Sequence, residues 1–336
     1  MRSDKNSSAF DRAGRRQLAI QPKVDLSIPE SKHSPRLKTK HTVGKFHFSQ
    51  AAFRLYQIHE PHIMRPMMKS LSNHTTWQPA LKILLILVTL IVLFTWLALT
   101  PAGLLGKADA IGYSVCHRIA VRSFLLGDRQ LPLCARCSGM YLGALLAMVY
   151  LGSFGRKGGL PPLRLAWVLG LFVVAFGIDG VNSYLHFFPS APWLYNPENW
   201  LRLVTGTGMG LGLGAVVVAV VHQTLWQNYD PQPALNSWRR LLLLIVMAGV
   251  LDWMIWSENP LLLFPLAVLS SATVLLILTL VYTVVWTLIS KQDNRFESLR
   301  QVWVAGLAGF LTALLQIAVI DAGRFLLTGT WGGFNL

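Results

Sequence analysis

Apolar and polar residues alternate along this chain in whole segments rather than residue by residue. From residue 81 onward, long apolar runs are separated by short polar stretches. A helix of about 20 apolar residues crosses the hydrocarbon layer of a bilayer. The pattern therefore predicts about seven transmembrane helices, at residues 81–100, 139–154, 165–187, 203–221, 241–256, 261–289 and 302–320.

The second of these runs is short for a membrane span. We expect its helix to begin earlier, near Pro132, because proline suits the first turn of a helix. With that extension, residues 80–336 are predicted to form an all-α, polytopic transmembrane bundle.

Charge is distributed very unevenly. Residues 1–79 hold 14 of the 30 Lys and Arg residues but only 5 of the 15 acidic ones, and they are rich in Ser and Pro. This composition predicts a disordered basic tail attracted to anionic lipid headgroups. The tail has no RNA-binding signature or zinc-finger spacing, so we expect the bilayer and its headgroups as partners and no nucleic acid.

The loops predict the orientation, because cytoplasmic loops retain Lys and Arg. The outer loops 188–200 and 257–260 contain only the acidic residues Glu198 and Glu258 as charged groups. The N-terminus is therefore predicted to be cytoplasmic, in a cell membrane of the inner or plasma type. The inner loops then contain Arg156, Lys157, Arg164, Arg239, Arg240, Lys291, Arg295 and Arg300.

One predicted outer segment, residues 101–138, breaks this charge rule. Its basic residues are Lys107, Arg118, Arg122, Arg129 and Arg136. Because these charges lie on the side that topology disfavours, we interpret them as part of a site.

The fourth predicted helix carries glycine at every second position from Gly206 to Gly214. The sequence lacks the spacing of a dinucleotide-binding loop, and no strand precedes it. On a membrane helix, Gly206, Gly210 and Gly214 form one ridge of small residues, while Gly208 and Gly212 form another. Such ridges favour close packing of neighbouring helices.

The strongest candidate for chemistry is the segment that contains all three cysteines, Cys116, Cys134 and Cys137, together with His117. Three thiolates and an imidazole form a ligand set of the Cys3His type that zinc or another transition metal accepts. Thiol redox chemistry is the alternative, because a C-x-x-C at a helix N-terminus has its thiolate stabilised by the helix dipole and here by Arg136. A third interpretation is three small buried residues or a static disulfide.

Three carboxylates follow long apolar runs near the predicted outer ends of helices: Asp179, Asp252 and Asp321. Arg202 opens the fourth helix on the same side, after Asn199, and we expect it to pair with Asp179. Charged groups within membrane spans usually face the bundle interior and pair. The thiols, arginines and carboxylates are therefore predicted to converge on one outward-facing pocket, and ion pairs that only hold the helices together are the alternative.

These residues also carry a resemblance to a known family. C-H-R-x-x-x-R-S-F from Cys116, L-P-L-C-A-R-C-S-G-x-Y-L-G from Leu131, I-D-G-x-N from Ile178 and N-x-x-R-L-x-T-G from Asn199 resemble a family of prokaryotic multi-pass membrane proteins, domain of unknown function 2085. The resemblance spans about residues 108–216. It implies that the motif positions are Cys116, His117, Arg122, Ser123, Cys134, Arg136, Cys137, Asp179, Asn182, Asn199 and Arg202.

We therefore predict an integral membrane protein with an outward-facing Cys/His/Arg/Asp site of the metal-binding, zinc type. Whether the metal is structural or supports an enzyme stays open at this point. A membrane thiol–disulfide oxidoreductase that uses the C-x-x-C is the alternative function. A transporter with paired Asp and Arg groups along its path is the third.

Overall fold

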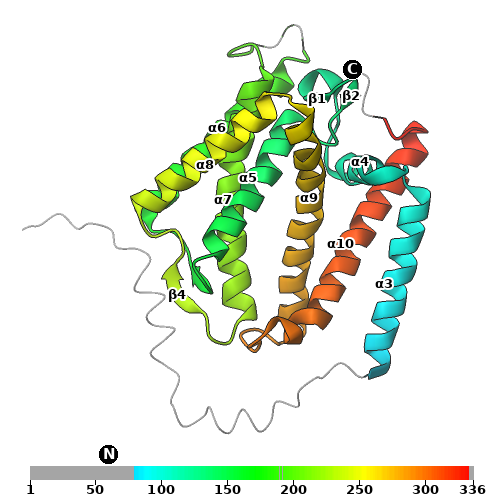
Figure 1. Cartoon of the computed structure of the whole chain (residues 1–336), viewed down its shortest axis with the longest axis vertical. Coiled ribbons are helices and arrows are strands. Elements are labelled where there is room, and N and C mark those ends of the chain that lie inside the picture. The colour runs from blue at the N-terminus through cyan, green and yellow to red at the C-terminus, as the bar shows by residue number, and fades with distance from the viewer. Residues whose placement is uncertain (1–78, 189, 191, 333–336) are drawn as a thin grey trace, which may run out of the picture. The chain divides into compact units, whose positions relative to one another are not determined.

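The computed structural model describes residues 79–188, 190 and 192–332 (Figure 1). The predicted basic tail, residues 1–79, lies outside the described residues except for its last one. All described residues belong to one unit of the chain, His74–Leu336.

The described part of the chain is helical, with only four short strands. Its α-helices are α3 (Pro79–Leu99), α4 (Gly103–Val115), α5 (Ala135–Gly152), α6 (Leu163–Leu185), α7 (Asn199–Leu225), α8 (Trp238–Trp256), α9 (Pro260–Ile289) and α10 (Leu299–Thr328). The strands form two pairs, antiparallel β1 (Leu125–Leu126) with β2 (Arg129–Gln130) and parallel β3 (Lys157–Gly159) with β4 (Asp230–Pro233).

Among the described residues, six helices are long and apolar enough to cross a membrane: α3, α5, α6, α7, α9 and α10. The protein is therefore a multi-pass membrane protein with an all-α bundle, as predicted. The remaining predicted span, 241–256, is also a helix, α8. It carries three charged residues, Arg239, Arg240 and Asp252, and for that reason it is not among the six. The cytoplasmic position of the N-terminus stays a prediction.

The segment predicted as one outer loop, residues 101–138, contains more structure than expected. It forms α4, a 3-10 turn (Ala120–Arg122) and the β1–β2 hairpin. At 13 residues, α4 is too short to span a bilayer, and the search for long apolar runs therefore missed it. The next helix also begins later than expected, at Ala135 rather than near Pro132.

Helices α5 and α7 pack closely against each other, and their glycines explain how (Figure 1). A Cβ added at Gly206 would collide with the backbone oxygen of Arg136, and one at Gly210 with that of Met140. Gly143 on α5 likewise abuts the backbone of Thr207. Glycine lets two helix backbones come into direct contact. The predicted ridge Gly206, Gly210 and Gly214 therefore forms the α7 side of the α5–α7 contact.

The second glycine row turns toward α6 rather than α5. A Cβ added at Gly208 would press against the side chain of Phe172. Helix α7 is therefore held between α5 and α6. This arrangement brings the start of α5, the end of α6 and the start of α7 together at one end of the bundle.

Candidate metal centre and the adjoining arginine cluster

Two chain segments meet where α4 ends and α5 begins. Helix α4 stops because Cys116 adopts an extended conformation, with φ −132° and ψ 145°. Gly112, one turn earlier, lies against the backbone oxygen of Pro132, where a Cβ would not fit. This close approach places Cys116 beside Cys134, the extended residue immediately before α5.

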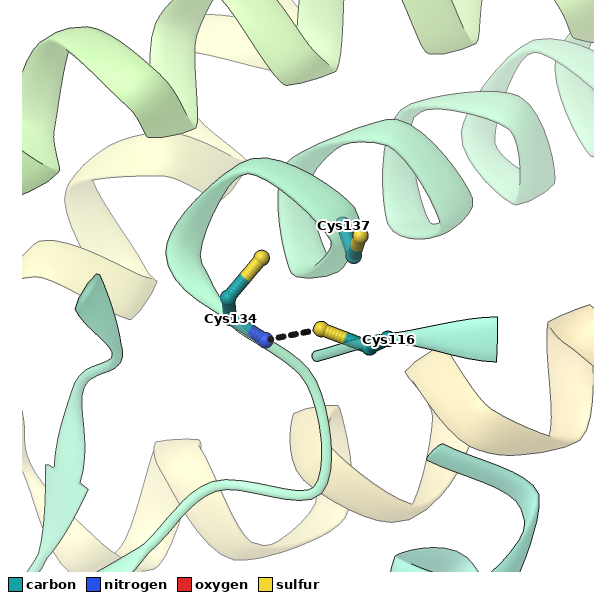
Figure 2. Close-up of side chains that lie close together, drawn as sticks. All are labelled: Cys116, Cys134 and Cys137. Carbon is teal, nitrogen blue, oxygen red and sulfur yellow. Dashed lines mark hydrogen bonds between the residues drawn. The ribbon is translucent and has the colours of Figure 1, made fainter. Parts of the chain in front are cut away.

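The three thiols gather at this crossing (Figure 2). The sulfur atoms of Cys116, Cys134 and Cys137 all lie within 4.8 Å of one another, close enough to bind one metal ion. The backbone N–H of Cys134 donates a hydrogen bond to Cys116 Sγ at 3.3 Å. Cys116 and Cys134 are 4% and 2% exposed, and none of the three thiols forms a disulfide. The sequence placed these residues together only along the chain, and the fold brings them together in space.

The thiols outside the membrane-spanning segments are not equivalent. Hydrogen bonds from the Cys134 and Cys137 thiols lower the pKa of Cys116 well below its usual value. The hydrogen bond to Cys116, together with burial, raises the pKa of Cys134. Cys116 is therefore the thiol that ionises first, and the N-terminal end of α5 adds a favourable dipole.

His117 lies at the edge of the thiol group rather than within it. Its Nδ1 is 3.9 Å from Cys116 Sγ, whereas the ring is not among the atoms that all lie within 4.8 Å of one another. Its Nε2 is buried and has no hydrogen-bond partner among the described residues. The imidazole is thus near the sulfurs, but it must reorient to share an ion with them.

An arginine cluster adjoins the thiols, and Ser183 on α6 is at its centre. Arg122 Nη2 donates to the Ser183 carbonyl oxygen at 2.9 Å. Arg136 Nη2 donates to Ser183 Oγ at 2.9 Å, and Arg202 Nε donates to the same oxygen at 3.4 Å. Burial and the neighbouring charges of Arg202 and Arg136 lower the pKa of Arg122 to about 10. The cluster therefore concentrates positive charge.

Asp179 is a buried carboxylate within this cluster, and its partner in the direct ion pair differs from the one expected. Arg136 Nε donates to Asp179 Oδ2 at 2.9 Å, and the two side chains form an ion pair. Arg202, the predicted partner, donates to Asn199 Oδ1 at 2.7 Å instead. Arg136 reaches Asp179 because the α5–α7 contact and the α6–α7 contact bring α5 and α6 to the same end of α7. The direct ion pair is therefore Arg136 with Asp179, while Arg202 interacts with Asp179 only through its charge.

The two predicted asparagines form hydrogen bonds with the backbone of neighbouring loops. Asn182 Nδ2 donates to the carbonyl oxygen of Tyr195 at 2.9 Å, and its Oδ1 accepts from the backbone N–H of Leu194 at 2.7 Å. The Tyr195 hydroxyl in turn donates to Asp179 Oδ1 at 2.9 Å. Burial and this hydrogen bond raise the pKa of Tyr195 to about 12, so it stays a neutral donor. Asn199 Nδ2 donates to the carbonyl oxygen of Val121 at 3.3 Å.

Two predicted carboxylates lie elsewhere in the bundle. Asp252 on α8 accepts from Thr207 Oγ1 at 2.5 Å, and Asp321 on α10 accepts from Trp96 Nε1 at 3.1 Å. Within the described ranges, neither forms a hydrogen bond or ion pair with the arginine cluster. The single pocket expected from the sequence is therefore two adjoining clusters, with Asp252 and Asp321 apart.

Sequence reasoning missed three residues that organise this end of the molecule. Ser183 is a small polar residue, and its only signal is its position four residues after Asp179, on the same face of α6. Tyr195 lies in a loop without a motif. Asp109 on α4 pairs with Arg118 at 3.0 Å and with Arg129 at 2.5 Å, which explains two of the unexpected basic residues of segment 101–138.

Comparison with known proteins identifies the family. Residues 116–216 match a family described as a predicted membrane protein, DUF2085. An uncharacterized protein of Methanocaldococcus jannaschii is 23% identical over 115 residues, which are 34% of this chain and 69% of that protein. An uncharacterized protein of Methanothermobacter thermautotrophicus is 32% identical over 92 residues, 27% of this chain and 74% of that protein. The chain belongs to the DUF2085 family.

The family expected from the sequence motifs is thus confirmed. The matched range begins at Cys116 and contains both clusters described above. It ends before α8, so Asp252 and Asp321 lie outside it. No solved structure matches the chain.

Proposed function

We propose that this protein binds one transition-metal ion of the zinc type through Cys116, Cys134 and Cys137, with His117 as the fourth ligand. The observation that carries the proposal is the convergence of three thiols from two chain segments, with Cys116 and Cys134 buried and Cys137 partly buried. Thiolate and imidazole together form the Cys3His ligand set of structural zinc sites.

The spacing of the sulfurs supports one ion rather than three independent thiols. Zinc–sulfur bonds of about 2.3 Å in a tetrahedron separate neighbouring sulfurs by about 3.8 Å. All three sulfurs already lie within 4.8 Å of one another, so small side-chain movements are enough. His117 needs a larger rotation. Its buried Nε2 has no hydrogen-bond partner in the described part of the chain, which supports a ligand at this ring.

The charges around the thiols also favour a metal–thiolate centre. Three thiolates and one divalent ion leave one net negative charge. The start of α5 offers its partial positive charge to that site. The adjoining cluster holds three arginines, Arg122, Arg136 and Arg202, against two carboxylates, Asp179 within it and Glu198 near Arg202. The surplus positive charge offsets the thiolates.

In this proposal, the ion would fix the segment between the end of α4 and the start of α5. Coordination would join Cys116, at the end of α4, to the first turn of α5. The residues between them include Arg122 and Ser123, and Ser123 Oγ accepts from Gln130 Nε2 at 2.9 Å. Buried sites in which the protein supplies all four ligands are structural rather than catalytic. The metal would therefore keep Arg122 in place against Ser183.

Metal analysis of the full chain, purified in detergent without chelator, tests the proposal. We expect about one transition-metal ion per chain. Cys134→Ser and Cys137→Ser should each lose the ion, and Cys116→Ser or His117→Ala should weaken its binding. His186→Ala is the matched control, because His186 packs on Trp193 in the same end of the chain and should leave the metal content unchanged.

A count of free thiols separates this proposal from thiol redox chemistry. Bound metal protects the thiols from alkylation until a chelator is added. Protein without metal but with a Cys134–Cys137 disulfide that shifts on addition of quinone would contradict the metal site and favour an oxidoreductase. Protein without metal and with thiols that react freely would contradict both and leave three small buried residues.

A further inference from the structure

A cavity of about 580 Å³ lies between α3 and α10, which run side by side (Figure 1). Its rim includes Ile91, Leu99 and Leu326, which are 65%, 72% and 84% exposed. Both helices are long and apolar enough to cross a membrane. Because the rim is apolar and belongs to two spans, the cavity opens toward the lipid phase rather than toward water.

The wall of this cavity contains a buried carboxyl group. Asp321 is 2% exposed, and its Oδ2 accepts a hydrogen bond from Trp96 Nε1 at 3.1 Å. Its Oδ1 is buried and has no hydrogen-bond partner among the described residues. Arg324, one turn further along α10, donates to the carbonyl oxygen of Cys116 at 2.8 Å. Since an unpaired buried polar atom is costly, an oxygen in this position points to a ligand.

We propose that this cavity binds a membrane-dissolved apolar molecule whose hydroxyl group hydrogen-bonds to Asp321 Oδ1. The volume lies within the range of about 300–1,000 Å³ that is usual for small-molecule sites. A hydroxyl both donates and accepts, so it pairs with the carboxyl whether or not the latter is protonated. The apolar lining, including Thr95 methyl, Ala318 and Phe325, accommodates the rest of the molecule.

This inference goes beyond the metal site and does not depend on it. The cavity shares none of the proposed metal ligands. Trp96 nevertheless belongs to the same buried apolar cluster as Cys116 and Cys134, and Trp331 packs against that cluster. The occupant would therefore lie next to the thiol end of the protein.

Photolabelling of the full chain in lipid nanodiscs tests the proposal, with a long-chain alcohol that carries a diazirine as the probe. We expect labels on α3 and α10 around the cavity, mapped by mass spectrometry. Asp321→Leu should lower this labelling about tenfold, as loss of one hydrogen bond implies. Ala318→Phe narrows the cavity next to Asp321 without changing the carboxyl and should also lower labelling. Val319→Phe, on the lipid-facing side of α10, is the matched control and should label as the natural chain does.

Competition identifies the class of hydroxyl. Unlabelled dodecanol and an alkyl hydroquinone should each reduce labelling. The ethers in which every hydroxyl is methylated cannot donate a hydrogen bond and should compete more weakly than the parent molecules. A stronger effect of the hydroquinone assigns the site to phenolic molecules, and a stronger effect of dodecanol assigns it to aliphatic alcohols. Equal labelling of Asp321→Leu, Ala318→Phe and the natural chain would overturn the proposal, as would labels away from α3 and α10.

Discussion

The α5–α7 contact and the α3–α10 contact are built in opposite ways. In α7, 56% of the most apolar stretch is buried, and glycines on both helices bring the backbones together. In α3 only 11% of the corresponding stretch is buried, and a cavity of about 580 Å³ separates part of it from α10. In the α5–α7 contact the two helix backbones touch directly. The α3–α10 contact instead leaves a cavity that opens toward lipid.

The polar groups differ in the same way. At the end of the α5–α7 contact, Arg122, Arg136, Arg202 and Asp179 all have hydrogen-bond partners within the protein. At the α3–α10 contact, one oxygen of Asp321 has none among the described residues. The comparison suggests that the tightly packed region is a scaffold for the thiol site, while the loosely packed region has room for a ligand.

The largest loss of stability is expected from a larger side chain in the tightly packed α5–α7 contact. Gly210→Leu should abolish the folded protein, because its side chain would collide with the Met140 backbone, which cannot move as a side chain does. Overpacking usually costs about 1–3 kcal/mol, and a backbone obstacle exceeds that range. The measurement is the yield of monodisperse protein by size-exclusion chromatography in detergent.

Two control variants test whether the loss of folding is specific to the α5–α7 contact or follows from any larger side chain. Gly249→Leu on α8 meets no atom within 4 Å and should be neutral or slightly stabilising, since leucine favours helix over glycine. Ala318→Phe adds its ring to the α3–α10 cavity, which has room for it, and should also fold. If Gly210→Leu folded as well as these two, the contrast between the contacts would be wrong.

The second effect concerns the buried ion pair. Arg136→Leu should destabilise the protein by about 3–5 kcal/mol, because it leaves Asp179 buried without its countercharge. Asp179→Leu should cost a similar amount, and the double variant should cost less than the sum. Thermal unfolding in one detergent measures all three.

Arg202→Leu combined with Asp179→Leu is the matched comparison for this cycle. Arg202 donates to Asn199 and Ser183 rather than to Asp179, so its coupling to Asp179 should be weaker than that of Arg136. Strictly additive effects for Arg136 and Asp179, or stronger coupling for Arg202, would contradict the pairing seen in the structure.

The sequence predicted the helices well because the bilayer leaves few alternatives. A run of about 20 apolar residues must satisfy its own backbone, and a helix does so. Helix α4 is not under this constraint, because its 13 residues are too few to cross a membrane. Residues 101–138 were therefore expected to form only a loop. The sequence pattern also did not show that the helix after Pro132 begins at Ala135.

The site could be predicted only in part, for a related reason. The cysteines are close in sequence, and their chemistry is evident from residue type alone. The partner of Asp179 depends instead on how α5 and α6 pack against α7, and sequence order favoured Arg202, which the structure replaces with Arg136. Ser183 has no distinctive chemistry, so its position between three arginines became evident only in three dimensions.

X-ray absorption at the zinc edge of the purified full chain tests the central claim most directly. The account predicts a first shell of three sulfur atoms at about 2.3 Å and one nitrogen at about 2.0–2.1 Å. His117→Ala should remove the nitrogen contribution and leave the three sulfurs. Protein without a stoichiometric transition metal, or a metal surrounded only by oxygen and nitrogen, would contradict the proposed thiolate centre.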